Sequence, residues 1–213
     1  GVGATLPTAG DMTYTGHTFK GWYDNENLTG FPVTAIGNTE TGNKEYWAKW
    51  EANTYTVTLN AGGGTINSGN VTGYTYGVGA TLPTDVTRTG YTFKGWYDNE
   101  NLTGSPVTAI GDTETGNKEY WAKWEANTYT VTLNAGGGTI NNGNVTGYTY
   151  GVGATLPTAG DMTYTGHTFK GWYDNENLTG SPVTAIGNTE TGNKEYWAKW
   201  EANTYTVTLN AGG

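Results

Sequence analysis

The amino-acid sequence predicts a mainly β protein, or α+β at most, made of small modules of one kind in tandem. The string GVGATLPT occurs at 1–8, 77–84 and 151–158. Glycine accounts for 35 of the 213 residues and aromatic residues for 14%. Apolar residues alternate with threonine, as in strands with one buried face. This composition disfavours long helices and favours short strands joined by tight turns.

The internal repeats divide the chain into four segments. The string KEYWAKWEANTYTVTLNAGG occurs at 44–63, 118–137 and 194–213, which indicates one small domain per repeat. We expect complete repeats at 53–126 and 127–202. Residues 1–52 form a partial repeat that lacks its first strand, and residues 203–213 are the first strand of a further repeat.

Four strands are expected in each complete repeat. In residues 53–126 the first strand has alternating Tyr55, Val57 and Leu59 and ends at consecutive glycines, which permit a turn. The second strand contains Tyr74 and Tyr76.

The third expected strand is YTFKGWYDN at 91–99, and the fourth is KEYWAKW at 118–124. If Phe93 and Trp96 are both buried, strict alternation fails, and Gly95 should form a bulge that corrects the register. The segment 99–117 between these strands is rich in glycine and proline, so it holds at most one helical turn.

The connections between the strands and between the repeats also carry information. TAGDMTYTGH in the first and third copies becomes the shorter TDVTRTGY in the middle copy, which indicates an exposed loop. Only EANT, residues 125–128, separates the complete repeats. Because so short a linker restricts bending, we expect beads on a semi-rigid rod, each adding roughly 30–40 Å.

The strings YTVTLNAGGGTI, YTYGVGATLPT, RTGYTFKGWYDN and EYWAKW, in this order and spacing, resemble the Listeria-Bacteroides repeat, which is related to the B repeat of internalin B. The resemblance covers essentially the whole chain. It implies a four-stranded β-grasp, ubiquitin-like module, found in tandem on cell-surface and secreted bacterial proteins as stalks or adhesive regions. An extracellular or cell-surface location follows from it, and it supplies no catalytic residues.

The charge and the rare residue types argue against several classes of function. Nineteen acidic and ten basic residues give a net charge of −9, which repels nucleic acid and anionic lipid. No run of eighteen apolar residues occurs, so membrane insertion is not expected. The two histidines, His17 and His167, occupy equivalent positions where the middle copy has Tyr91. We therefore predict no enzymatic activity and no cofactor.

A metal site is also not predicted. YDNEN at 23–27, 97–101 and 173–177 groups oxygen ligands of the kind that calcium accepts. The carboxylates lack the regular spacing of calcium-binding loops, however, and clusters of Asn and Asp commonly form turns. We interpret these segments as turns.

The tryptophans are the main candidates for binding. Trp50, Trp124 and Trp200 share a strand face with alanines and should belong to the core. The opposite face carries Trp47, Trp121 and Trp197 beside Lys49, Lys123 and Lys199. These six residues either cover the sheet and contact the next repeat, or stack on a glycan or a host surface protein.

The preferred functional hypothesis is a spacer or stalk without chemistry of its own. The alternative is a weak, multivalent glycan- or protein-binding module. Besides adjacent repeats, a second copy of the chain is an expected partner. Residues 203–213 have the sequence of the first strand that 1–52 lacks, so copies are expected to join head to tail.

Overall fold

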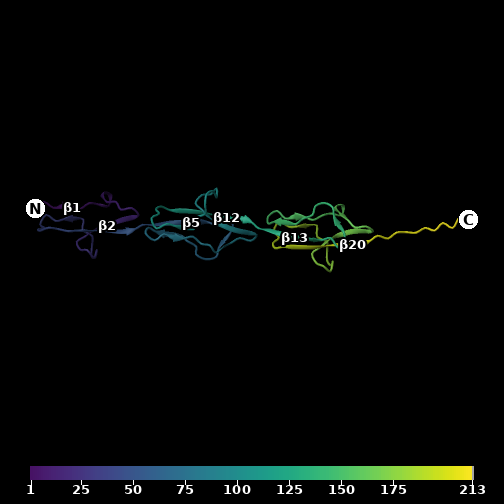
Figure 1. Cartoon of the computed structure of the whole chain (residues 1–213). Helices are drawn as coiled ribbons and strands as arrows, with labels where there is room; N and C mark the ends of the chain where they lie inside the picture. Colours follow the sequence, from purple (N-terminus) through teal and green to yellow (C-terminus); the bar gives the residue numbers. More distant parts are fainter. Residues whose placement is uncertain (213) are drawn as a thin grey trace. The chain divides into compact units, whose positions relative to one another are not determined.

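The computed structural model describes residues 1–212 and divides into two compact units. Unit 1 contains residues 1–87 and 93–124, and unit 2 contains residues 88–92 and those from 125 onward. The secondary structure is almost entirely β, as predicted (Figure 1). The only helices among the described residues are two three-residue 3-10 turns.

The second repeat forms a four-stranded sheet with the order β10-β12-β5-β7. Its first strand, β5 (Thr54–Asn60), pairs antiparallel with β7 (Gly73–Thr75) and parallel with β12 (Lys118–Ala126). The edge strand β10 (Tyr91–Tyr97) lies next to β12. The first strand is therefore central, and this mixed order is consistent with a β-grasp module.

The third repeat repeats this arrangement with the order β15-β13-β20-β18. Its strands are β13 (Thr128–Asn134), β15 (Gly147–Thr149), β18 (His167–Tyr173) and β20 (Lys194–Ala202). β13 again pairs antiparallel with the second strand and parallel with the last one. Four sheet strands per complete repeat were predicted from the sequence.

Short two-stranded pairs cover this sheet in both complete repeats. In the second repeat β6 (Thr65–Ile66) pairs with β9 (Val86–Thr87), and β8 (Ala80–Thr81) pairs with β11 (Ala109–Ile110). The third repeat pairs β14 (Thr139–Ile140) with β17 (Met162–Thr163), and β16 (Ala154–Thr155) with β19 (Ala185–Ile186).

The connections agree with one expectation and correct another. The segment 99–117 contains β11 and no helical turn, in agreement with the expectation of at most one; Leu102 takes a positive φ of 54°, and Pro106 lacks the N–H that a helix needs. The segment of variable length is not simply an exposed loop. The long copies add the 3-10 turns η1 (Ala9–Asp11) and η2 (Ala159–Asp161), but Met162 after η2, like Val86 in the short copy, belongs to the core.

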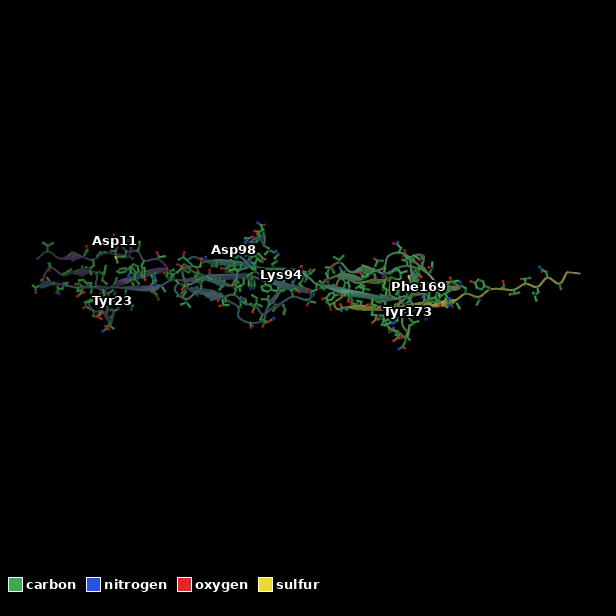
Figure 2. All side chains as sticks on the ribbon, in the orientation of Figure 1. Asp11, Tyr23, Lys94, Asp98, Phe169 and Tyr173 are labelled. Carbon is green, nitrogen blue, oxygen red and sulfur yellow. The ribbon has the colours of Figure 1, made fainter. Side chains whose placement is uncertain are left out.

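The predicted glycine bulge is present. In β18 the register shifts between Phe169, opposite Trp200, and Gly171, opposite Lys199. Gly171 has a φ of 124°, and Gly95 in β10 has 121°. The bulge lets Phe169 and Trp172 both face the core while Tyr173 faces the other side of the sheet, and Figure 2 labels Phe169 and Tyr173.

Each complete repeat has its own apolar core, centred on a tryptophan. Trp96 is 2% exposed and Trp172 is 1% exposed. Their indole N–H groups donate to the carbonyl oxygens of Pro83 (2.7 Å) and Pro157 (2.9 Å). Trp124 and Trp200 pack against the cores as expected, beside buried Ala122 and Ala198.

The first repeat contains only two-stranded pairs. β1 (Ala4–Thr5) pairs with β3 (Ala35–Ile36), and β2 (His17–Tyr23) pairs with β4 (Trp47–Ala52). Within the described part of the chain, no strand lies on the other edge of β4, where β12 has β5. Residues 203–212, yellow in Figure 1, form no strand, and Tyr205, Val207 and Leu209 are exposed.

Candidate functional site

The six predicted binding residues lie on the sheet face opposite the core, but the lysines are already engaged. In register, Trp197 lies opposite Tyr173. The amine of Lys199 is 5.2 Å from the centroid of the Tyr173 ring. Lys123 and Lys49 make the same cation–π contact with Tyr97 and Tyr23, at 5.0 and 5.3 Å.

Lys123 also donates to the carbonyl oxygen of Leu102 at 3.4 Å. Lys123 is half-buried, and its side chain connects the 98–105 loop to the sheet next to the Tyr97 ring. All three lysines thus have a contact within their own repeat, and a role of these residues in binding stays a prediction.

The tryptophans of this set, in contrast, line a hollow that occurs in all three repeats. Trp121 and Trp197 border hollows of about 460 Å³, and Trp47 borders one of about 450 Å³. The hollow lies beside β11 and the start of β12 in the second repeat, and beside β19 and β20 in the third. Its apolar wall in the second repeat is formed by Val107 and Ile110.

Charged groups surround the remaining wall of the hollow. Lys118 forms an ion pair with Glu114 at 2.5 Å, and this hydrogen bond raises the lysine pKa. Glu119 accepts a hydrogen bond from Asn60 at 2.8 Å. Asp98 completes the set, so three carboxylates and one ammonium leave the hollow with a formal charge of −2.

Tyr120 places a hydroxyl group at this hollow. The residue is only 5% exposed, and burial raises its pKa, so it stays protonated at neutral pH. Asp98 and Glu114 lie near enough to raise that pKa further, while Lys118 lowers it. Among residues 1–212 no protein group forms a hydrogen bond with this hydroxyl. None of the side-chain polar atoms shielded from solvent in these residues lacks a hydrogen-bond partner, so the hydroxyl is not shielded from solvent. The hydroxyl therefore opens onto solvent in the hollow.

The YDNEN segments are turns, as interpreted from the sequence. The side-chain oxygen of Asn99 accepts hydrogen bonds from the Thr103 N–H (3.2 Å) and hydroxyl (3.0 Å). The Asn99 amide donates to the Thr103 carbonyl at 2.9 Å. No group of three or more potential metal-binding side chains occurs within residues 1–212.

A second feature is a joint formed around the asparagine that precedes each first strand. In unit 2, the Asn127 N–H donates to Gly90 O (2.9 Å) and its carbonyl accepts from the Tyr150 N–H (2.9 Å). The side-chain oxygen of Asn127 accepts from the Thr92 hydroxyl at 2.6 Å. The rings of Tyr91 and Tyr150 meet edge to face, 5.4 Å apart.

Unit 1 contains the same joint with other residue numbers. Asn53 bonds to Gly16 O (2.8 Å), to the Tyr76 N–H (2.9 Å) and to the Thr18 hydroxyl (2.5 Å). His17 meets the Tyr76 ring edge to face at 5.3 Å. The sequence predicted Tyr76 within the second strand, but the strand ends at Thr75 and Tyr76 belongs to the joint.

The variable loop adapts the joint to histidine or tyrosine. In the long first copy His17 stacks on Tyr14 with ring centroids 4.1 Å apart. In the short middle copy Arg88 takes the place of that tyrosine and lies 3.9 Å over the Tyr91 ring. The two-residue length change therefore accompanies a different partner for the same joint position.

Sequence reasoning missed Tyr120 as a polar group, and it missed the joint. Alternation assigned Tyr120 to the core, which is correct for its ring, but a pattern does not show where a hydroxyl emerges. The joint had a usable signal, since an asparagine precedes every TYTVTLN string.

Comparison with known proteins agrees with this architecture. The model of the Listeria-Bacteroides repeat domain matches residues 2–49, 55–123 and 129–199. Two relatives from Evansella cellulosilytica are 35% and 34% identical over 93% and 90% of this chain, named "Putative Gly-rich membrane protein" and "Putative membrane protein". The chain spans 22% and 28% of their lengths.

No solved structure matches the chain, and none of the described helices is long and apolar enough to cross a membrane. The family match covers most of the sequence in three consecutive copies, each of which coincides with one set of strands. The chain therefore belongs to the Listeria-Bacteroides repeat domain family.

Proposed function

We propose that this chain is a spacer region of a bacterial surface or secreted protein, in which each repeat sets a fixed distance to the next and does no chemistry. The relatives carry membrane-protein names and are several times longer than the chain. A tandem array within such a protein suits the role of holding another part away from the cell.

The observation that carries this proposal is the joint. A flexible linker leaves its backbone groups to water, whereas Asn127 has its N–H, its carbonyl and its side-chain oxygen all bonded to protein. Its side-chain amide reaches the Tyr129 hydroxyl at 3.4 Å. Every bond of this kind restricts rotation at the connection, and the repetition of the joint at Asn53 makes it a property of the repeat.

Distance measurements between spin labels test this proposal in the full chain. The protein lacks cysteine, so Ser105→Cys and Ser181→Cys introduce labels at two equivalent, exposed positions. We expect one narrow distance distribution in solution. Inserting four glycines after Asn127 should broaden it, and the same insertion after Asn203 serves as the control.

A distribution that is already as broad in the unmodified chain as in the Asn127 insertion would contradict the spacer proposal. It would mean that the joint opens in solution and sets no distance.

A further inference from the structure

We propose that the hollow beside Trp121 is a binding site for a neutral, polyhydroxylated ligand, most simply a glycan chain, and that each repeat carries one such site. Such a site is an additional function besides the spacer role, and it lies in a defined hollow that the tryptophan borders. The corresponding tryptophans are Trp47 and Trp197.

A tyrosine hydroxyl at each hollow is available for hydrogen bonding to a ligand. A protonated hydroxyl on a 95% buried side chain has no protein partner at Tyr120, and the same is true at Tyr196, which is also 5% exposed. Water reaches this hydroxyl through the hollow, so its hydrogen bond is open to exchange with a ligand. A ligand that accepts a hydrogen bond there replaces water without leaving the group unpaired.

Polar and apolar side chains both line the hollow. Sugar hydroxyls both donate and accept, so they suit a site where Asp98 and Glu114 accept and Tyr120 donates. Val107 and Ile110 provide apolar contact for the C–H groups of a sugar ring, and Trp121 adds an aromatic surface at the border. About 460 Å³ lies within the range of small-ligand sites.

Charge excludes other ligands. The formal charge of −2 repels phosphate, sulfate and uronic acids. A divalent cation is disfavoured, because no cluster of three potential metal ligands occurs in residues 1–212.

Hydrogen bonds to the sheet hold the walls of the hollow in place. Asn117 accepts a hydrogen bond from the Thr56 N–H at 3.0 Å, and the Tyr74 hydroxyl donates to Gly116 O at 2.7 Å. The third repeat has the same two bonds at Asn193 and Tyr148. The first repeat lacks the strand that supplies them, so the two complete repeats should bind more tightly.

Titration of the full chain with named oligosaccharides, followed by two-dimensional NMR, tests the proposal. The probes are cellohexaose, xylohexaose, mannohexaose and chitohexaose, with hexagalacturonate as the anionic counterpart. We expect at least one neutral probe to shift the amide signals of residues 107–121 and 183–197, and hexagalacturonate to bind more weakly.

Tyr46 lines the hollow of the first repeat, as Tyr120 and Tyr196 line those of the other two. The variant Tyr46→Phe/Tyr120→Phe/Tyr196→Phe removes only the three hydroxyls and should weaken binding by about three- to tenfold per site. The matched control is Tyr55→Phe/Tyr129→Phe/Tyr205→Phe, which removes hydroxyls that contact asparagines of the joint series. Its affinity should equal that of the unmodified chain.

Three results would overturn the proposal: no shift with any neutral probe at millimolar concentration, equal or tighter binding of hexagalacturonate, or unchanged affinity in the Tyr46/Tyr120/Tyr196 variant. None of these outcomes touches the spacer role, which the spin-label distances test separately.

Discussion

Glycine at the joint shows most directly how one residue position controls the contact between neighbouring repeats. Gly90 has a φ of 76°, and a Cβ atom built there would lie 2.3 Å from the Tyr150 ring. Gly166 has nearly the same φ, 74°, but no atom lies within 4 Å of its Cβ position. The two sites therefore separate backbone strain from the cost of displacing a ring.

Gly166→Ala should lower the free energy of unfolding by about 1–2 kcal/mol, the cost of a left-handed residue with a side chain. Gly90→Ala should cost clearly more, because the methyl group also displaces the Tyr150 ring. Urea unfolding of unit 2, followed by hydrogen exchange in residues 125–202, measures both. Equal costs would show that the ring contact does not stabilise the joint.

The two long loops should contribute to the acid sensitivity of the chain, together with Glu51, Asp85 and Glu201, whose pKa values hydrogen bonds also lower. Hydrogen bonds from the Thr158 hydroxyl and N–H lower the pKa of Asp161 below its ordinary 3.8, and bonds from the Thr8 N–H and hydroxyl lower that of Asp11. A lowered folded-state pKa stabilises the fold above the ordinary pKa, and this stability is lost as the pH falls through the folded value.

Asp11→Asn/Asp161→Asn should therefore be less stable than the unmodified chain at pH 7, and the difference should shrink as the pH falls below the ordinary value of 3.8 and through the lowered folded-state pKa. Urea midpoints measured from pH 7 to pH 2 test this. Glu100→Gln, which removes a charge without a protein hydrogen bond, serves as the control. A difference that is independent of pH would exclude the carboxylate as its cause.

Among the elements, the third strand should depend on its tryptophan to different degrees in the third repeat and the first. Trp172 is 1% exposed and Trp22 is only half-buried, yet both donate to a proline carbonyl, at 2.9 and 2.8 Å. Because the indole hydrogen bond is the same at both positions, the same substitution at each compares how much packing contributes to stability.

Trp172→Phe should destabilise its repeat by about 2–3 kcal/mol, through lost packing and an unpaired carbonyl. Trp22→Phe should lower the free energy of unfolding of the first repeat by less than about 1 kcal/mol, because water can reach this half-buried site and hydrate the proline carbonyl. Peptide-resolved hydrogen exchange gives the opening free energy of each repeat. Similar costs at both positions would mean that the first repeat has a packed core of its own in solution.

The elements were predictable from the sequence where local chemistry decides them. Alternation located the four sheet strands, and the pair Phe93 and Trp96 predicted a glycine bulge, which the register shift at the equivalent Gly171 shows. The short strands could not be predicted, because a two-residue strand such as β11 has no period and depends on a partner far along the chain.

The candidate site was predictable only in part. Strand alternation placed Trp121 and Lys123 on the face opposite the core, but it could not show that Trp121 borders a hollow or that Lys123 contacts Tyr97 and Leu102. The hydroxyl of Tyr120 became a candidate only when the loop with Glu114 was placed beside it. Tertiary structure, not pattern, brings these groups together.

Whole molecules should also associate with one another, which stays a prediction. Among residues 1–212 no strand pairs with one edge of β4, where β12 and β20 have a parallel partner, and residues 204–210 repeat the sequence of β5 and β13. A second copy of the 1–213 polypeptide can supply the missing strand by β-augmentation. Sedimentation velocity should then show dimers and longer chains as concentration rises.

Val207→Asp/Leu209→Asp places charges where β5 and β13 carry valine and leucine, so it should abolish this association. Thr206→Asp/Thr208→Asp, on the opposite face of the same strand, is the matched comparison and should weaken it less. Sedimentation as a monomer at every concentration would contradict strand exchange between copies.

The central claim is that the joint gives the array a fixed increment of length per repeat. Small-angle X-ray scattering of the chain with one, two or three extra copies of residues 53–126, inserted after residue 126, tests it most directly. The Val207→Asp/Leu209→Asp background keeps copies apart. The account predicts that the maximum dimension rises linearly, by roughly 30–40 Å per added repeat. Growth that falls off with each added copy, as in a flexible or collapsed array, would contradict it.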